Sequence, residues 1–132
     1  MKILIVDDSR FLRIANERAL VRAGHTVVTA ADGEEGLRFA QERKPDLVVL
    51  DMLLPKLSGP EVLRALRKDP STASIPVMVL TSLPQTNEQK LIGEGATSYF
   101  AKSELMVDKG PGLFVAAVER MFTKAAAKAA GS

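Results

Sequence analysis

Residues 47–51 have the sequence LVVLD, in which four consecutive apolar residues lead directly into an aspartate. Related patterns recur at ILIVDD (3–8), VMVLT (77–81) and YFAK (99–102). Short continuous apolar runs that alternate with amphipathic stretches of helical length are typical of parallel strands buried on both faces. The pattern therefore predicts a doubly wound α/β domain, with helices on both sides of one parallel sheet.

The other segments complete five strand–helix units. A run at 27–30 supplies the second strand, Ser9 is a suitable N-cap for the first helix, and Gly24 suits the turn that ends it. Gly59-Pro60 places a proline at the first position of the third helix. Further helices are expected at 34–43, at 86–94 and from about 113. We expect a flavodoxin-like three-layer (βα)5 sandwich whose five parallel strands lie in the order 2-1-3-4-5.

Polar functional groups follow four of the expected strands. In the order 2-1-3-4-5 the first and third strands are neighbours, and ligands of such sheets bind just beyond the carboxyl ends of the strands. One crevice is therefore expected to bring together three carboxylates, a hydroxyl and an ammonium group. These belong to Asp7, Asp8, Asp51, Thr81 and Lys102.

This set of groups suits phosphoryl chemistry. Three carboxylates in close proximity repel one another, and a divalent cation relieves the repulsion. Mg²⁺ prefers carboxylate oxygens and retains waters, which leaves positions for phosphate oxygens, and a carboxylate beside such a cation is a competent nucleophile for phosphorus. A transferring phosphoryl group has three equatorial oxygens. Mg²⁺, the ammonium of Lys102 and the hydroxyl of Thr81 supply one partner for each.

The composition excludes several other kinds of site. The 132 residues fit one globular domain, and with no cysteine and one histidine, His25, the chain has neither a disulfide framework nor a Cys- or His-rich metal site. The net charge of +2 is dispersed, so no direct nucleic-acid binding is expected. No apolar stretch is long enough to cross a bilayer and no signal peptide is apparent, so we expect a cytoplasmic protein without a membrane partner.

Over residues 1–122 the chain resembles the receiver domain of two-component response regulators. The matching pieces are the acidic pair at 7–8, Thr81-Ser82, the segment YFAK at 99–102, and DMLLPKLSG at 51–59, which fits the family pattern D-x-x-[ML]-P-x-x-x-G. Each piece alone is weak, whereas their order and their positions at strand ends make the set specific. The remaining residues, 123–132, form an Ala/Lys-rich tail that suits a helix extension or a linker.

The resemblance implies a role for each matching residue. Asp51 would be the phosphoacceptor, Asp7 and Asp8 would bind Mg²⁺ or Mn²⁺ with Asp51, and the backbone carbonyl of Met52 would also ligate the metal. Thr81 and Lys102 would bind the phosphoryl group. Thr81 and Tyr99 would form the switch that reports phosphorylation.

The resemblance also implies a signalling function. A histidine kinase or a phosphotransfer domain would donate the phosphoryl group, and the domain, which is not a conventional enzyme, would catalyse its own phosphorylation and dephosphorylation. The face formed by 86–94, 99–101 and the last helix would then change. That face would bind a downstream protein, a tethered output domain or a second copy of the chain. The sequence is compatible with a stand-alone protein similar to the chemotaxis response regulator and also with a receiver excised from a longer chain.

Three features depart from the family pattern. Ser103 stands where a proline usually follows the lysine, and the connection at 103–112 is longer than usual. Leu53 and Leu83, two residues beyond Asp51 and Thr81, are apolar. Because these two positions border the path of the attacking water in this family, we expect slow self-dephosphorylation.

Alternative interpretations remain open at this stage. Asp8 or Ser9 could simply cap the first helix, and Tyr99 could be ordinary packing. A haloacid-dehalogenase-like phosphatase would need an acid where Leu53 stands, and a flavodoxin would need a phosphate loop after the first strand. The main rival is a receiver-like interaction or scaffold module that works without phosphorylation.

Overall fold

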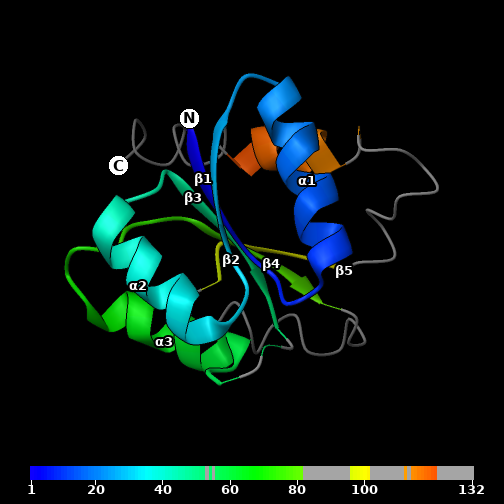
Figure 1. Cartoon of the computed structure of the whole chain (residues 1–132). Helices are drawn as coiled ribbons and strands as arrows, with labels where there is room; N and C mark the ends of the chain where they lie inside the picture. Colours follow the sequence, from blue (N-terminus) through cyan, green and yellow to red (C-terminus); the bar gives the residue numbers. More distant parts are fainter. Residues whose placement is uncertain (53, 55, 82–95, 102–111, 113, 122–132) are drawn as a thin grey trace.

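Strands and helices alternate over residues 2–81 in the computed structural model, which describes residues 1–52, 54, 56–81, 96–101, 112 and 114–121 (Figure 1). The strands are β1 (Lys2–Val6), β2 (Thr26–Ala30), β3 (Leu47–Asp51), β4 (Val77–Thr81) and β5 (Ser98–Ala101). The helices are α1 (Arg10–Arg22), α2 (Gly33–Arg43) and α3 (Gly59–Lys68), and residues 114–121 are also helical. The helix expected at 86–94 lies outside the described residues.

The strands form one five-stranded sheet in the order β2-β1-β3-β4-β5, and every neighbouring pair is parallel. This is the predicted order, with β1 between β2 and β3. Ile3 of β1 pairs with Val27 and with Leu47, and Asp51 at the end of β3 pairs with Leu80. The carboxyl ends of β1, β3 and β4 therefore lie side by side.

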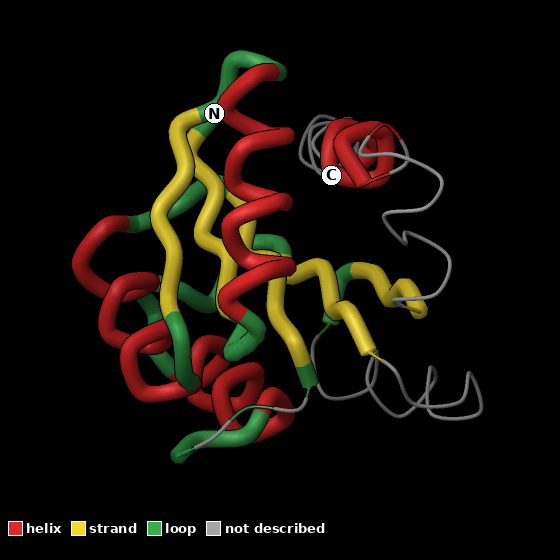
Figure 2. Tube along the Cα trace, turned by 45° about the vertical axis from the view of Figure 1, so that its right-hand side comes forward, coloured by secondary structure: helices red, strands yellow, loops and turns green. Residues whose placement is uncertain are grey.

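Helices cover both faces of the sheet, with α2 and α3 on one side and α1 and residues 114–121 on the other (Figures 1 and 2). Because successive side chains of a strand point to opposite faces of the sheet, the strand residues contribute to two separate hydrophobic cores. Leu4 and Val6 pack toward α2 and α3, whereas Ile3 and Ile5 pack toward Leu20 of α1 and the helical residues 114–121. Burial on both faces explains why the strands have continuous rather than alternating apolar sequence.

The helix ends follow local sequence signals. The Ser9 side chain caps α1 by accepting a hydrogen bond from the amide of Leu12 at 3.3 Å, and Gly24, after the end of α1, has φ +96°, which suits glycine. Some boundaries differ from the expectation by one residue: β2 begins at Thr26, α2 at Gly33 and α3 at Gly59, so Pro60 is the second residue of α3. Ser58 and Glu61 form a capping box in front of this helix. No helix in the described part of the chain is long and apolar enough to cross a membrane.

His25, in the turn after α1, is largely covered by the rest of the protein. Its side chain is only 12% exposed, and its Nε2 lies 3.7 Å from Oε1 of Glu119 in the helical residues 114–121. The turn after α1 brings His25 against a helix that is distant in sequence. A glycine turn next to a histidine carries no local signal of such a contact, so the sequence pattern missed it.

Candidate metal and phosphoryl site

Three carboxylates meet at the carboxyl edge of the sheet. One ligand oxygen from each of Asp7, Asp8 and Asp51 lies within 4.8 Å of the others. Asp7 and Asp51 are buried, with 2% and 3% of their surface exposed, whereas Asp8 is exposed. The structure thus brings together the three acids that the sequence predicted and places one of them toward solvent.

The turn between β1 and α1 positions Asp7 and Asp8. The amide of Asp7 donates to the carbonyl of Ala30 at 3.1 Å and so extends the pairing of β1 with β2 by one residue. Oδ1 of Asp7 accepts the amide of Ser9 at 2.9 Å, and Ser9 then caps α1. Because Ser9 is the N-cap, helix capping does not account for Asp8.

The loop after β3 folds back tightly behind Asp51. The amide of Met52 donates to the carbonyl of Leu80 at 3.1 Å, and the amide of Gly59 donates to the carbonyl of Met52 at 3.2 Å. A Cβ on Gly59 would lie 2.6 Å from Cα of Met52 and 2.9 Å from the carbonyl oxygen of Asp51. Only glycine allows this approach, which gives a physical reason for the last residue of the D-x-x-[ML]-P-x-x-x-G pattern.

The hydrogen bond to the Met52 carbonyl bears on its expected role as a metal ligand. A carbonyl oxygen has two lone pairs, and Gly59 already engages one of them. A metal contact from Met52 would have to use the second. The ligand role of Met52 therefore stays a prediction.

The backbone places two other expected site residues near this edge. Thr81 is the last residue of β4, directly after Leu80, the partner of Asp51. Tyr99 lies in β5 and pairs with Val79. Lys102 follows the last residue of β5 in sequence but lies outside the described residues, as do Leu53, Leu83 and Ser103.

A second contact, which the sequence analysis missed, joins the loop after β3 to the start of α2. Nζ of Lys56 lies 3.5 Å from Oδ2 of Asp32, whose Oδ1 caps α2 by accepting the amide of Glu35 at 2.8 Å. The hydrogen bond from Glu35, with a contribution from Lys56, holds the pKa of Asp32 below its usual value of 3.8. A Cβ on Gly33 would overlap the carbonyl oxygen of Leu57, so the loop and the helix end are in direct contact.

Arg13 is a further residue at the cluster that the sequence motifs did not indicate. Its guanidinium donates from Nη1 to the backbone carbonyl of Asp7 at 2.9 Å. A signal was available, because the first turn of α1 contains no acidic residue and the helix dipole disfavours cations at that end. An arginine there suggests a negative partner in front of the helix.

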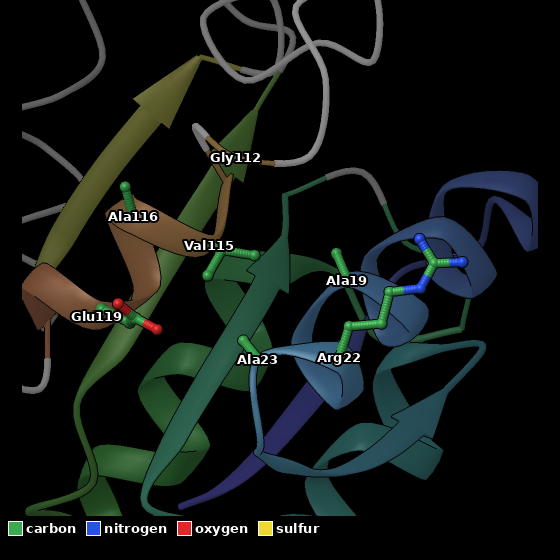
Figure 3. A pocket seen from close by; sticks show the side chains of 7 residues that line it. All are labelled: Ala19, Arg22, Ala23, Gly112, Val115, Ala116 and Glu119. Atoms are coloured by element: carbon green, nitrogen blue, oxygen red, sulfur yellow. The ribbon is translucent and has the colours of Figure 1, made fainter.

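An open groove of about 390 Å³ lies away from the acids, between the C-terminal half of α1 and the last described helix (Figure 3). Alanine side chains from both helices line it, with Arg22 on α1 and Glu119 on the other helix. None of the three carboxylates borders this groove, so it is separate from the acid cluster.

The donor set at the carboxyl edge fits a hard divalent cation. Carboxylate oxygens are the ligands that Mg²⁺ prefers, and three of them within 4.8 Å carry a negative charge that a cation would offset. The exposure of Asp8 beside two buried acids gives the cluster an open side toward solvent. The three carboxylates therefore fit Mg²⁺ at the carboxyl edge of the sheet, with Asp8 on the side toward solvent.

Fold and site define a class of doubly wound α/β domains with a cluster of three carboxylates at the carboxyl edge of the sheet. Residues 3–108 match the response regulator receiver domain, and the chain belongs to this family. The match covers most of the described residues and includes Asp7, Asp8 and Asp51. Receiver domains act in two-component systems, which is consistent with a phosphorylation switch.

Curated relatives include regulators of very different length. The chain is 41% identical to the gliding motility regulatory protein of Myxococcus xanthus over 110 residues, which are 82% of this chain but 14% of that protein. It is 38% identical to protein PilH of Pseudomonas aeruginosa over 103 residues, which are 76% of this chain and 84% of PilH. The chain thus spans only a small part of some relatives and most of another.

The fold also matches solved receiver structures. The chemotaxis protein CheY4 of Vibrio cholerae superimposes with a TM-score of 0.81 at 30% identity, over 91% of this chain and 97% of CheY4. The predicted flavodoxin-like receiver fold is therefore confirmed.

Proposed function

We propose that this domain is a phosphorylation-activated switch that accepts a phosphoryl group on Asp51. The observation that carries the proposal is the cluster of Asp7, Asp8 and Asp51, whose ligand oxygens lie within 4.8 Å of one another at the carboxyl edge of the sheet. Asp51 ends β3 in the centre of that edge, between β1 and β4. Membership of the receiver family supports the same assignment.

In the proposed reaction a histidine kinase or a phosphotransfer domain presents a phosphohistidine. A carboxylate oxygen of Asp51 forms a bond to phosphorus as the P–N bond breaks, and the electron pair of that bond stays on the imidazole of the donor. Asp7 and Asp8, together with Asp51, would hold Mg²⁺. When bound, Mg²⁺ supplies positive charge to a phosphoryl oxygen. Thr81 and Lys102 would bind the other phosphoryl oxygens.

Phosphorylation would act by stabilising one of two packings of the domain. Thr81 at the end of β4 and Tyr99 in β5 would couple the site to the surface formed by 86–94, β5 and residues 114–121. A downstream protein, a tethered output domain or a second copy of the chain would read that surface. Attack of water on phosphorus would release phosphate and restore the Asp51 carboxylate, slowly if Leu53 and Leu83 border its path.

The proposal extends to the organisation of the chain. The receiver domain would occupy 1–122 and act in the cytoplasm, with 123–132 as a helix extension or linker. The family match over residues 3–108 lies within the proposed receiver domain and ends before residue 122.

Intact-mass spectrometry after incubation with acetyl phosphate tests the proposal. We expect one phosphoryl adduct on the wild type that requires Mg²⁺ and is absent from Asp51→Asn. Asp32→Asn is the matched control, because Asp32 is a partly buried carboxylate that caps α2 and is not a member of the cluster.

The mass spectra distinguish a phosphorylated switch from a domain that works without phosphorylation. An adduct that persists in Asp51→Asn would contradict Asp51 as the acceptor. No adduct on the wild type, with or without Mg²⁺, together with an unchanged NMR spectrum on addition of beryllofluoride, would instead support a receiver-like interaction module that works without phosphorylation.

A further inference from the structure

We infer that Arg13 is a positioning residue for the acid cluster: by holding the backbone of Asp7, it orients Asp7 and Asp8 for binding a divalent cation. The inference rests on the proposed function, because it concerns the affinity of the same metal site. Arg13 lies outside the sequence motifs that indicated the site.

The contact occurs where regular pairing ends. β1 finishes at Val6, so the carbonyl of Asp7 lies just beyond the strand. Nη1 of Arg13 donates to this carbonyl at 2.9 Å in partly buried surroundings. A hydrogen bond from a charged donor is shorter and stronger than a neutral one, and it is worth more where water is partly excluded.

Together with two other hydrogen bonds, Arg13 fixes Asp7 from three directions. The amide of Asp7 donates to Ala30 at 3.1 Å, its Oδ1 accepts the amide of Ser9 at 2.9 Å, and its carbonyl accepts Arg13. Asp8 follows in the same turn, so the orientation of the Asp7 carbonyl also sets the direction in which the chain enters Asp8. Groups that orient metal ligands in this way typically change metal affinity about 10- to 100-fold when they are removed.

The position of Arg13 on α1 is unfavourable for the helix alone. The amide of Arg13 donates to the carbonyl of Ser9 at 2.9 Å and so closes the first turn of the helix, where the dipole disfavours a cation. The acids in front of α1 offset that cost. Arg13 is therefore explained by the site and not by helix stability.

Charge and orientation predict opposite effects of removing Arg13. Loss of a positive charge near three carboxylates would strengthen Mg²⁺ binding, whereas loss of the hydrogen bond to Asp7 would weaken it. Arg10 provides the matched control, because it is exposed in the first turn of the same helix and Arg10→Ala removes the same charge.

Titration of Mg²⁺ by calorimetry or NMR on the full chain tests the inference. We expect Arg13→Ala to raise the Kd for Mg²⁺ about 10-fold, Arg13→Lys to raise it less, and Arg10→Ala to leave it unchanged or slightly lower. Thermal unfolding in EDTA shows separately whether each variant is folded before metal is added.

The outcomes separate this inference from the proposed function. If the wild type binds Mg²⁺ and Arg13→Ala binds it equally well or more tightly, the role of Arg13 is overturned and the proposed function is not. A wild type that shows no Mg²⁺ binding would overturn both. If Arg13→Ala does not fold, Arg13→Lys provides the test. A Kd of Arg13→Lys for Mg²⁺ equal to that of the wild type would then overturn the inference.

Discussion

Aspartates in two regions of this molecule have different surroundings. At the helix ends, Asp32 accepts the amide of Glu35 at 2.8 Å, and Asp69 accepts the amide and the hydroxyl of Ser71, both at 2.9 Å. These hydrogen bonds hold the pKa of both carboxyls below the usual value. At the sheet edge, Asp7, Asp8 and Asp51 instead lie within 4.8 Å of one another.

The difference shows how the same side chain acquires different functions. A capping carboxylate has its charge balanced by donors of the chain itself, so it contributes to stability. A clustered carboxylate adds to the charge of its neighbours, so the cluster attracts a cation from solution. Substitutions at the caps should therefore change stability, and substitutions in the cluster should change the response to Mg²⁺.

The largest expected effect lies where the two regions meet. Gly33, which follows the Asp32 cap, contacts the loop behind Asp51, and a Cβ there would overlap the Leu57 carbonyl. We expect Gly33→Ala to lower the free energy of unfolding by about 3 kcal/mol, because the helix end or the loop must move. Urea denaturation measures the loss. Gly112→Ala is the control, since a Cβ on Gly112 meets nothing within 4 Å, and an equal loss in both variants would contradict the close approach.

A slightly smaller effect on the free energy of unfolding should distinguish the carboxylate cluster from the Asp32 cap. At Mg²⁺ concentrations about 100 times the Kd, wild-type protein should gain about 2.7 kcal/mol in the free energy of unfolding. Asp51→Asn removes a buried carboxylate of the cluster and should lose most of this gain, whereas Asp32→Asn should keep it. Urea denaturation with and without Mg²⁺ provides the comparison. A gain lost equally in both variants would remove the distinction between the two regions.

The cap itself should contribute about 1 kcal/mol, the usual cost of replacing an N-cap aspartate by alanine. Asp32→Ala should lower stability by this amount at neutral pH without changing the Kd for Mg²⁺. Because the folded-state pKa of Asp32 is lowered, its charge stabilises the protein above the unfolded pKa, and this contribution is lost as pH falls through the folded pKa. The difference between wild type and Asp32→Ala should therefore shrink in acid, and a difference that grows below the usual value of 3.8 would contradict the assignment.

The smallest effect concerns the ion pair between Lys56 and Asp32. Lys56 is 61% exposed, so Lys56→Ala should cost only about 0.2–1 kcal/mol. Lys56 also has a left-handed backbone, with φ +67°, which glycine adopts without strain. Lys56→Gly should thus be at least as stable as Lys56→Ala in urea denaturation. A less stable glycine variant would show that the backbone conformation carries little strain here.

Much of the fold was predictable from local pattern. Runs such as those of β1 and β3 are apolar on both faces, and the structure confirms a doubly wound sheet in the predicted order. Within the described residues, some element boundaries differ by one residue, such as the start of α3 at Gly59. The burial of His25 against Glu119 was missed because it joins segments that are distant in sequence.

For the candidate site, too, some features were predictable from the sequence and others were not. The sequence by itself determined which acids follow β1 and β3, because a residue after a parallel strand must lie at the carboxyl edge whatever the packing. Only the tertiary structure decided that Asp7 and Asp51 are buried while Asp8 is exposed, and that Arg13 holds the Asp7 carbonyl. Burial and hydrogen-bond partners depend on how helices and loops pack against the strands, and local sequence patterns specify that packing only in part.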